Sequence, residues 1–222
     1  MKHFVLIAWM LILSFAAKSQ TAQEYYQEGL AQKDMQEYQL AINSFSEAIK
    51  LNPEYAEAYY QRGLSSLNLQ QNANAFRDFS TAIELNPLYS EAYYAKGYLL
   101  LMNQDYEMAI QYFTKAIELN PVYAKPYVNR GAAKQLLEDY EGAMQDFTKA
   151  IEIDPKNELV YLLRGNAKYE LGNLYDANED CTKAIEIDPN YANAFYYRGL
   201  TKLELEEFKG AIEDFSKTIQ ID

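Results

Sequence analysis

Few residues of this sequence could act as nucleophiles, or as acids and bases, in catalysis. The single histidine, His3, lies at the extreme N-terminus, so the single cysteine, Cys181, has no histidine in the rest of the chain to activate it. We expect Cys181 to fill space in the core. Carboxylates are numerous but scattered, as at Glu204, Glu206 and Glu207, which is typical of solvated helix faces. Without a glycine-rich phosphate loop or a calcium loop, we expect no enzyme activity, no cofactor and no metal; an enzyme that uses carboxylates alone is the least favoured alternative.

One set of charged residues is regularly spaced. An arginine precedes a glycine in four places, and each time an aspartate follows 16 residues after the arginine. The pairs are Arg62 and Asp78, Arg130 and Asp146, Arg164 and Asp180, and Arg198 and Asp214. Two further copies of this spacing change both residues, to Glu28 with Ser44 and to Lys96 with Tyr112. Because the two positions change together, we expect a structural Arg–Asp ion pair between two helices. The alternative is that the arginines face solvent.

The composition limits the kind of partner. The formal net charge is −12, from 32 acidic and 20 basic residues. Such a chain should repel nucleic acid, because binding to nucleic acid depends on Lys and Arg that neutralise phosphates. Apolar residues make up 49% of the chain and aromatic residues 14%, which predicts a sizeable core rather than disorder. A lone cysteine forms no internal disulfide, so packing alone must hold the fold.

A period of 34 residues governs the chain from residue 22 onward. Five of the six prolines keep this step, at Pro53, Pro87, Pro121, Pro155 and Pro189. Six glycines keep it as well, at Gly29, Gly63, Gly97, Gly131, Gly165 and Gly199. Two further series are Ala41, Ala75, Ala109, Ala143, Ala177 and Ala211, and Phe45, Phe79, Phe113, Phe147, Cys181 and Phe215. Apolar residues three and four apart run from Tyr59 to Leu69 and from Phe76 to Leu85, so each unit is predicted to be a pair of helices.

Each repeated residue type has an expected packing role. Glycine inside a helix costs about 1 kcal/mol relative to alanine. We therefore expect the glycines to allow close approach to an alanine of the second helix, while the phenylalanine fills the adjacent space. Asn or Asp before each proline is predicted to end a helix, because a residue before proline is pushed out of the helical region. A single helix pair cannot bury its apolar face, so the pairs must stack in a row.

Two segments that share these positions resemble the tetratricopeptide repeat (TPR). They are YAEAYYQRGLSSLNLQQNANAFRDFSTAIELNP and YANAFYYRGLTKLELEEFKGAIEDFSKTIQID. The resemblance covers Ala22 to Asp222 in six in-phase copies, at 22–55, 56–89, 90–123, 124–157, 158–191 and 192–222. It implies an all-α fold, a right-handed superhelical solenoid of antiparallel helix pairs. Beside the glycine, where the family favours a large apolar residue, this chain carries Glu28, Arg62, Lys96, Arg130, Arg164 and Arg198.

The resemblance also implies a binding surface on the concave side, lined by the first helix of each pair. One TPR subset clamps the C-terminal carboxylate of chaperones with Lys and Asn there, but the position of that lysine is aromatic or aliphatic in this chain. We therefore predict an aromatic groove that binds a peptide or protein segment, since tyrosine offers a large contact area with a polar tip. Its residues are Tyr26, Tyr60, Leu64, Tyr94, Tyr98, Lys125, Asn129, Leu162, Asn166 and Tyr196. The alternative is that these tyrosines only pack helix against helix.

Residues 1–21 follow a different pattern from the repeats. A short basic start leads into an apolar run from Phe4 to Ala17, and small and polar residues follow. The run is shorter than the roughly 20 residues that a helix needs to span a bilayer. We interpret the segment as a secretory signal peptide with a short lead-in, cleaved near Ser19. This predicts an exported protein, periplasmic or secreted, in a bacterial envelope; an uncleaved membrane anchor is the alternative.

These features predict a non-catalytic, exported scaffold for protein–protein interaction. The alternative is a self-associating structural module of a cell-envelope assembly. The last repeat carries three isoleucines at positions whose apolar side chains, in earlier repeats, are expected to be partly covered by the following repeat. They are Ile212, Ile219 and Ile221. We therefore expect a weak homodimer through the C-terminal repeat. The competing explanation is that the sequence is a truncated piece of a longer array.

Overall fold

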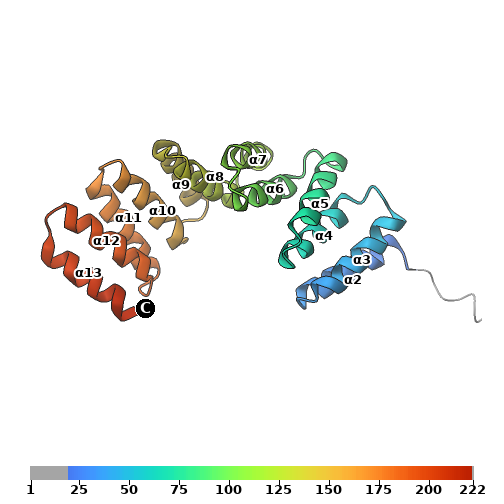
Figure 1. Ribbon diagram of the computed structural model, residues 1–222, viewed down its shortest axis with the longest axis horizontal. Helices are drawn as coiled ribbons and strands as arrows, with labels where there is room; N and C mark the ends of the chain where they lie inside the picture. The colour runs from blue at the N-terminus through green and yellow to red at the C-terminus, as the bar shows by residue number, and fades with distance from the viewer. Residues whose placement is uncertain (1–19, 222) are drawn as a thin grey trace, which may run out of the picture. The chain divides into compact units, whose positions relative to one another are not determined.

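The computed structural model describes residues 20–221, and all regular elements within this range are α-helices (Figure 1). They are α2 (Ala22–Asp34), α3 (Tyr38–Leu51), α4 (Ala56–Asn68), α5 (Asn72–Leu85), α6 (Ser90–Met102), α7 (Tyr106–Leu119), α8 (Ala124–Leu136), α9 (Tyr140–Ile153), α10 (Glu158–Glu170), α11 (Leu174–Ile187), α12 (Ala192–Glu204) and α13 (Phe208–Ile221). Each predicted repeat range holds one consecutive pair of helices. The all-α fold is thereby confirmed, whereas the signal peptide and its cleavage site lie outside the described residues.

The chain divides after Pro87 into two compact units. The first unit contains α2 to α5, and the second contains α6 to α13. In both units the two helices of a pair pack together, and the second helix of a pair also packs on the first helix of the next pair. This covers one pair with the next, which is how repeat proteins build a continuous core.

The repeated alanines and phenylalanines form the core of each unit. The first alanine series, from Ala41 to Ala211, is buried throughout. Phe45, Phe79, Phe113 and Phe147 are fully buried, and Cys181 takes the same place in the fifth pair. The prediction that Cys181 fills space in the core is therefore confirmed.

The repeated glycines lie against the phenylalanine rings. A Cβ added to Gly131 would lie 2.7 Å from Phe147 Cε1, closer than side-chain carbons approach one another in proteins. At Gly131 the nearest neighbour of an added Cβ is therefore the ring, while the expected close approach to an alanine is seen at Gly165. Gly165 differs from the other five: a Cβ there would lie 3.4 Å from the smaller Cys181 side chain and 3.3 Å from the Ala177 carbonyl oxygen.

The turn inside each pair contains a residue with left-handed backbone geometry, which the sequence did not reveal. These residues have φ between 59° and 75° and recur at one repeat position: Gln36, Gln70, Gln104, Glu138, Gly172 and Glu206. In the second pair the Gln71 amide donates to the Ser66 carbonyl at 2.9 Å, which is the Schellman arrangement that ends a helix. Five of the six residues are not glycine, and each such residue costs about 1–2 kcal/mol in this conformation.

The second helix of each of the first five pairs ends at the Asn or Asp before a proline, as predicted. Asn52 has φ −136° and ψ 91°, well outside the helical region. Its side-chain oxygen accepts a hydrogen bond from the Glu54 amide at 3.2 Å, which helps to shape the loop to the next pair. Within residues 20–221, none of the helices combines the length and the apolar character that crossing a bilayer requires.

Candidate binding surface

The second unit has a cleft at the first helices of its first two pairs. Its volume is about 430 Å³, and we call it the Tyr94 cleft. Helix α6 contributes Tyr94, the loop before α8 contributes Tyr123, and α8 contributes Lys125, Val128 and Asn129. The ends of α9 and α10 close it with Asp154 and Asn157. An apolar wall therefore lies beside an amide, a lysine and an aspartate.

Tyr94 is the central side chain of this cleft. Its hydroxyl oxygen accepts a hydrogen bond from Asn129 Nδ2 at 2.9 Å. Its ring lies 5.2 Å from the ring of Tyr123 and 5.9 Å from that of Phe113, measured between centroids. Burial raises the pKa of Tyr94 and the nearby Tyr98 adds to this, while the hydrogen bond from Asn129 opposes it. The hydroxyl is therefore neutral at physiological pH and carries a proton that it can donate to a ligand.

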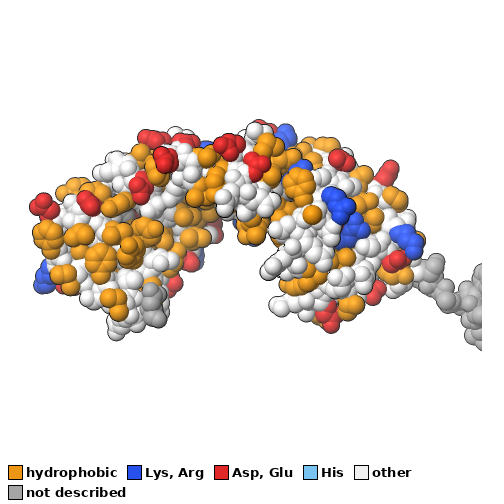
Figure 2. Space-filling model, viewed as in Figure 1, with side chains coloured by type: hydrophobic (Ala, Val, Ile, Leu, Met, Phe, Trp, Pro, Cys, Tyr) orange, Lys and Arg blue, Asp and Glu red, His pale blue; other side chains and the backbone are white. Residues whose placement is uncertain are grey.

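The first helices of the second unit also expose apolar side chains. The exposed large apolar residues on these helices are Tyr98 and Met102 on α6, Leu136 on α8, Leu159 on α10, and Tyr196 and Leu203 on α12. Figure 2 shows hydrophobic side chains at the surface of the second unit, in particular towards its C-terminal helices. Apolar side chains exposed in a series along stacked pairs are typical of an interaction surface.

The structure brings four of the ten predicted groove residues together. Tyr94, Lys125 and Asn129 line one cleft, and the Tyr98 ring lies 6.3 Å from that of Tyr94. Tyr196 is exposed on α12 and packs against the Tyr197 ring at 5.5 Å.

Two other predicted groove residues of the second unit have different roles. Leu162 is only 5% exposed and packs with Cys181, Ala184 and Ala194, so its assignment to the groove is wrong. Its neighbour Cys181 is smaller than phenylalanine, and the leucine therefore packs into the core at a position where four other pairs have a tyrosine and the fourth has Val128. The side-chain oxygen of Asn166 accepts a hydrogen bond from Gln135 Nε2, which ties α8 to α10.

The remaining predicted groove residues, Tyr26, Tyr60 and Leu64, belong to the first unit and are half-buried. The Tyr26 ring lies 5.7 Å from Phe45 and 4.8 Å from Tyr55. The Tyr60 ring lies 5.9 Å from Phe79. These tyrosines therefore pack against the core phenylalanine of their own pair, as the packing alternative requires, while part of each ring stays at the surface.

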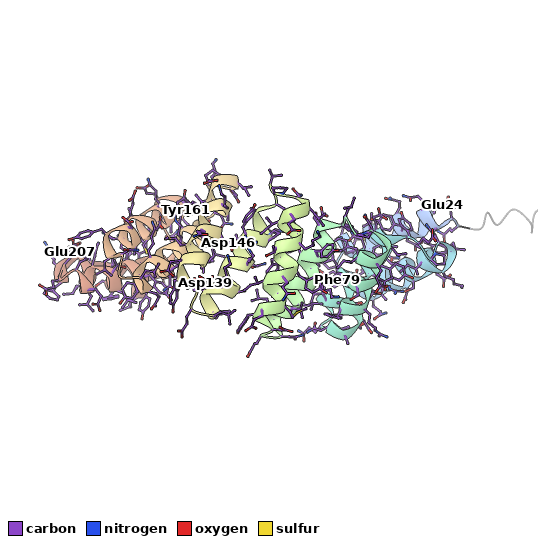
Figure 3. The ribbon with its side chains drawn as sticks, turned by 90° about the horizontal axis from the view of Figure 1, so that it is seen from above. Glu24, Phe79, Asp139, Asp146, Tyr161 and Glu207 are labelled. Carbon is purple, nitrogen blue, oxygen red and sulfur yellow. The ribbon has the colours of Figure 1, made fainter. Side chains whose placement is uncertain are left out.

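The structure also brings all four predicted Arg–Asp pairs together. In each pair the arginine Nη2 lies 2.6–2.7 Å from Asp Oδ1, and Nε donates to Oδ2 at 2.8–2.9 Å. Figure 3 labels Asp146, the aspartate of the fourth pair of helices. Each aspartate is buried, so the bidentate geometry offsets the cost of removing both charges from water. The alternative that these arginines face solvent does not describe the structure.

Each of these arginines also connects neighbouring pairs, which the sequence reasoning missed. Nη1 donates to a hydroxyl on the second helix of the preceding pair at 2.9–3.2 Å. The acceptors are Ser46, Thr114, Thr148 and Thr182, each 16 residues before its arginine. A search for polar residues at that spacing could have found them. The arginine thus joins three helices, two of its own pair and one of the pair before.

The two exceptional pairs replace the ion pair with other contacts. In the first pair Ser44 Oγ donates to Gln32 Oε1 at 2.8 Å. In the third pair the ammonium group of Lys96 lies 4.8 Å from the centroid of the Tyr112 ring, within the range of a cation–π interaction. In both repeats a different contact therefore joins the two helices.

The described residues offer little for chemistry. From residue 20 to 221, no three or more His, Cys, Asp or Glu side chains are grouped so that they could hold a metal ion. Burial, aided by the nearby Asp180 carboxylate, raises the pKa of the Cys181 thiol to about 12. A thiol that stays protonated is a poor nucleophile.

Sequence profiles of one family match most of the chain. Residues 90–123 and 124–157 match a profile described as "Tetratricopeptide repeat", and residues 56–87 and 159–191 match a second profile of that description. Residues 23–70 match a profile described as "TPR repeat". The chain matches none of the curated proteins with which it was compared.

Several solved structures are similar to the chain. YrrB, described as a TPR protein with an unusual peptide-binding site, has a TM-score of 0.72 and 25% identity over 80% of this chain and 92% of its own. PilW, described as a widely conserved type IV pilus biogenesis factor, has a TM-score of 0.75 and 20% identity over 87% and 90%. A tetratricopeptide repeat protein from Parabacteroides merdae has a TM-score of 0.66 and 23% identity over 92% and 80%. The likeness to the last two concerns the fold alone.

Proposed function

Because the chain belongs to the tetratricopeptide repeat family, we propose that it is a non-catalytic scaffold that binds a peptide or protein segment in the Tyr94 cleft. The observation that carries this proposal is the composition of the cleft. Aromatic and aliphatic walls adjoin a neutral Tyr94 hydroxyl, the Asn129 amide and two opposite charges, Lys125 and Asp154. Few, well-placed polar groups in an apolar cleft suit a ligand with both side chains and backbone amides. The similarity to YrrB, whose description includes a peptide-binding site, supports a peptide ligand.

The ligand would lie across the first helices of the second unit. From the Tyr94 cleft, exposed apolar side chains continue at Tyr98 and Met102 on α6 and at Leu136 on α8. Tyrosine supplies a large contact area with little loss of side-chain entropy. Methionine is flexible and can adapt its shape to a ligand. A segment with apolar side chains flanked by polar ones matches this surface.

Peptide selection on the purified chain, followed by affinity measurements, tests the proposal. We expect Tyr98→Ala and Lys125→Ala each to weaken a selected peptide about tenfold, which corresponds to about 1.4 kcal/mol. Tyr175→Ala is the matched control, since Tyr175 is an exposed tyrosine on the second helix α11. Equal affinities for all three variants and the unmodified chain would exclude the cleft as the binding site.

We also propose that the protein is exported in a bacterium and acts in the cell envelope, as either a periplasmic or a secreted protein. The support is the basic start and short apolar run of residues 1–21, with small residues near Ser19. N-terminal sequencing of protein recovered from the envelope fraction tests this. A mature chain beginning near Gln20 is expected, and a chain that retains Met1 would favour the membrane anchor.

Self-association is a second candidate function, favoured by one observation on α13. Ile212 and Ile219 are 65% and 79% exposed, whereas Ile110 and Ile117 at the same repeat positions are partly covered. Covering such side chains gains on the order of 1 kcal/mol each, which suits a weak homodimer through the C-terminal repeat. Light scattering over a hundredfold concentration range should show a dimer that Ile219→Asp removes. A monomer at every concentration would exclude this role.

A further inference from the structure

Three of the four Arg–Asp pairs hold a second cation. A lysine four residues after the arginine places Nζ 2.8–2.9 Å from Asp Oδ2: Lys134 at Asp146, Lys168 at Asp180, and Lys202 at Asp214. The Lys134 ammonium also donates to the Gly142 carbonyl oxygen at 3.3 Å, and Lys168 donates to the Asp176 carbonyl oxygen at 3.4 Å. These carbonyls belong to the residue four before the aspartate. The fold thus defines an ammonium site, made of a carboxylate oxygen and a backbone carbonyl.

The second repeat keeps the aspartate of this site but not the lysine. Arg62 and Asp78 form the same bidentate pair as in the other repeats. The position four residues after Arg62 is Ser66, whose side chain is far too short to reach the carboxylate. The other two repeats lose the site as a whole, with Gln32 and Ser44 in the first and Leu100 and Tyr112 in the third. The second repeat is therefore the exception among the six.

A pocket adjoins the position that the lysine would occupy. It has a volume of about 370 Å³ and is lined by Ser66, Gln71, Asn74 and Asp78, together with Ile42, Ser46, Tyr59, Arg62, Arg77 and Thr81. Ser66 occupies the lysine position, and Asn74 is the residue four before Asp78. The Asp78 side chain is 9% exposed, against 4–5% for the three aspartates that a lysine covers. Water and solutes therefore have more access to this carboxylate than to the others.

We propose that this pocket binds an alkylammonium group, either the side chain of a lysine from a partner protein or a free primary amine. The ammonium group donates to Asp78 Oδ2 and to the Asn74 carbonyl oxygen, as the lysine does in the fourth and fifth repeats. The alkyl part lies along Ile42 and the ring of Tyr59. This site is separate from the Tyr94 cleft, and neither proposal depends on the other.

The charges around the pocket set its affinity. Arg62 has a counterpart in every repeat that holds the lysine, so its positive charge is compatible with the site. Arg77 adds a charge, but its side chain is exposed and Nη2 donates to Asn74 Oδ1 at 2.5 Å. We expect solvent to screen Arg77 and binding of a single ammonium group to be weak, with saturation at millimolar concentration.

Nuclear magnetic resonance titration of the full chain with n-butylammonium chloride tests the proposal. Saturable shifts are expected at the amides of Ser66, Asn74 and Asp78, and sodium chloride at the same ionic strength should not reproduce them. Ser66→Lys supplies the missing ammonium group from within, so it should abolish these shifts and raise the melting temperature. The matched variant Lys134→Ser should create a second saturable site at Gly142 and Asp146.

A second titration distinguishes the source of the amine. Lysine with both backbone ends blocked should bind more tightly than n-butylammonium if a protein lysine is the ligand, and less tightly if a small amine is. Either result supports the ammonium site. The proposal is overturned if the unmodified chain shows no saturable amide shifts, which would mean that water alone fills the pocket. It is also overturned if the Ser66→Lys variant shows the same saturable amide shifts as the unmodified chain.

Discussion

Replacing equivalent glycines in two neighbouring repeats should destabilise the chain in one repeat and not in the other. In the fourth repeat, a Cβ at residue 131 would lie 2.7 Å from Phe147 Cε1 and 3.0 Å from Cδ1. In the fifth repeat, a Cβ at residue 165 would lie 3.2 Å from Asp180 Cβ and 3.4 Å from Cys181 Sγ. Both glycines are buried inside first helices, so the two substitutions differ mainly in what the added methyl group meets.

The expected magnitudes follow from two opposing effects. Each Gly→Ala change gains about 1 kcal/mol of helix propensity. At Gly131 the ring must shift, and overpacking of this kind costs about 1–3 kcal/mol, so Gly131→Ala should lower the free energy of unfolding by about 1 kcal/mol. At Gly165 the surroundings need to yield by only a few tenths of an ångström. We expect Gly165→Ala to be neutral or to stabilise by up to about 1 kcal/mol.

Urea unfolding followed by circular dichroism measures both changes, and hydrogen exchange of α8 and α10 amides locates them. A double-mutant cycle isolates the cause. Phe147→Cys gives the fourth repeat the partner that the fifth has, and in that background Gly131→Ala should no longer destabilise. Equal losses for Gly131→Ala and Gly165→Ala, or an unchanged loss in the Phe147→Cys background, would refute the reasoning.

Three further predictions concern titration, reactivity and the turns. Burial alone would raise the pKa of Asp214, but hydrogen bonds from Arg198 and the neighbouring lysine lower it overall. The stability that this carboxylate contributes is therefore fully present above about pH 4 and is lost as the pH falls through the lowered pKa. Asp214→Asn should therefore flatten the acid limb of a plot of melting temperature against pH. An unaltered acid limb would count against the ion pair. Because burial raises the pKa of Cys181 to about 12, iodoacetamide at about pH 8 should label it only after unfolding, and rapid labelling of the native chain would contradict its burial. Glu138→Gly should stabilise the chain and Gly172→Ala should destabilise it, each by about 1 kcal/mol in urea unfolding, because both residues have positive φ; shifts of the same sign would contradict this.

The helix pairs and the core could be predicted because the 34-residue period fixes them locally. Phe147 and Ala143 recur at the same step as their counterparts in other repeats, so their burial follows from helical spacing within one pair. The Arg130–Asp146 pair also lies within one repeat, and its two positions change together along the chain.

The features that the sequence did not predict depend on contacts between repeats or on backbone geometry. Thr114 accepts from Arg130 only because one pair stacks on the next in a particular register. The left-handed turn residue is Glu138 in the fourth repeat, a residue type that gives no signal of positive φ. Leu162 has the repeat position of Tyr94, but it packs into the core beside Cys181, which is smaller than the phenylalanine of other repeats. Assigning groove residues by repeat position alone does not take this smaller volume into account.

The central claim is that the Tyr94 cleft binds a peptide segment, and mapping a selected peptide on the isotopically labelled chain tests it most directly. The account predicts amide shifts that saturate together in α6 and α8, centred on Tyr94, Tyr98 and Asn129, with the Asn129 side-chain amide among them. Shifts confined to the second helices α7, α9 and α11 would contradict it. So would the absence of shifts at a peptide concentration that should saturate the chain.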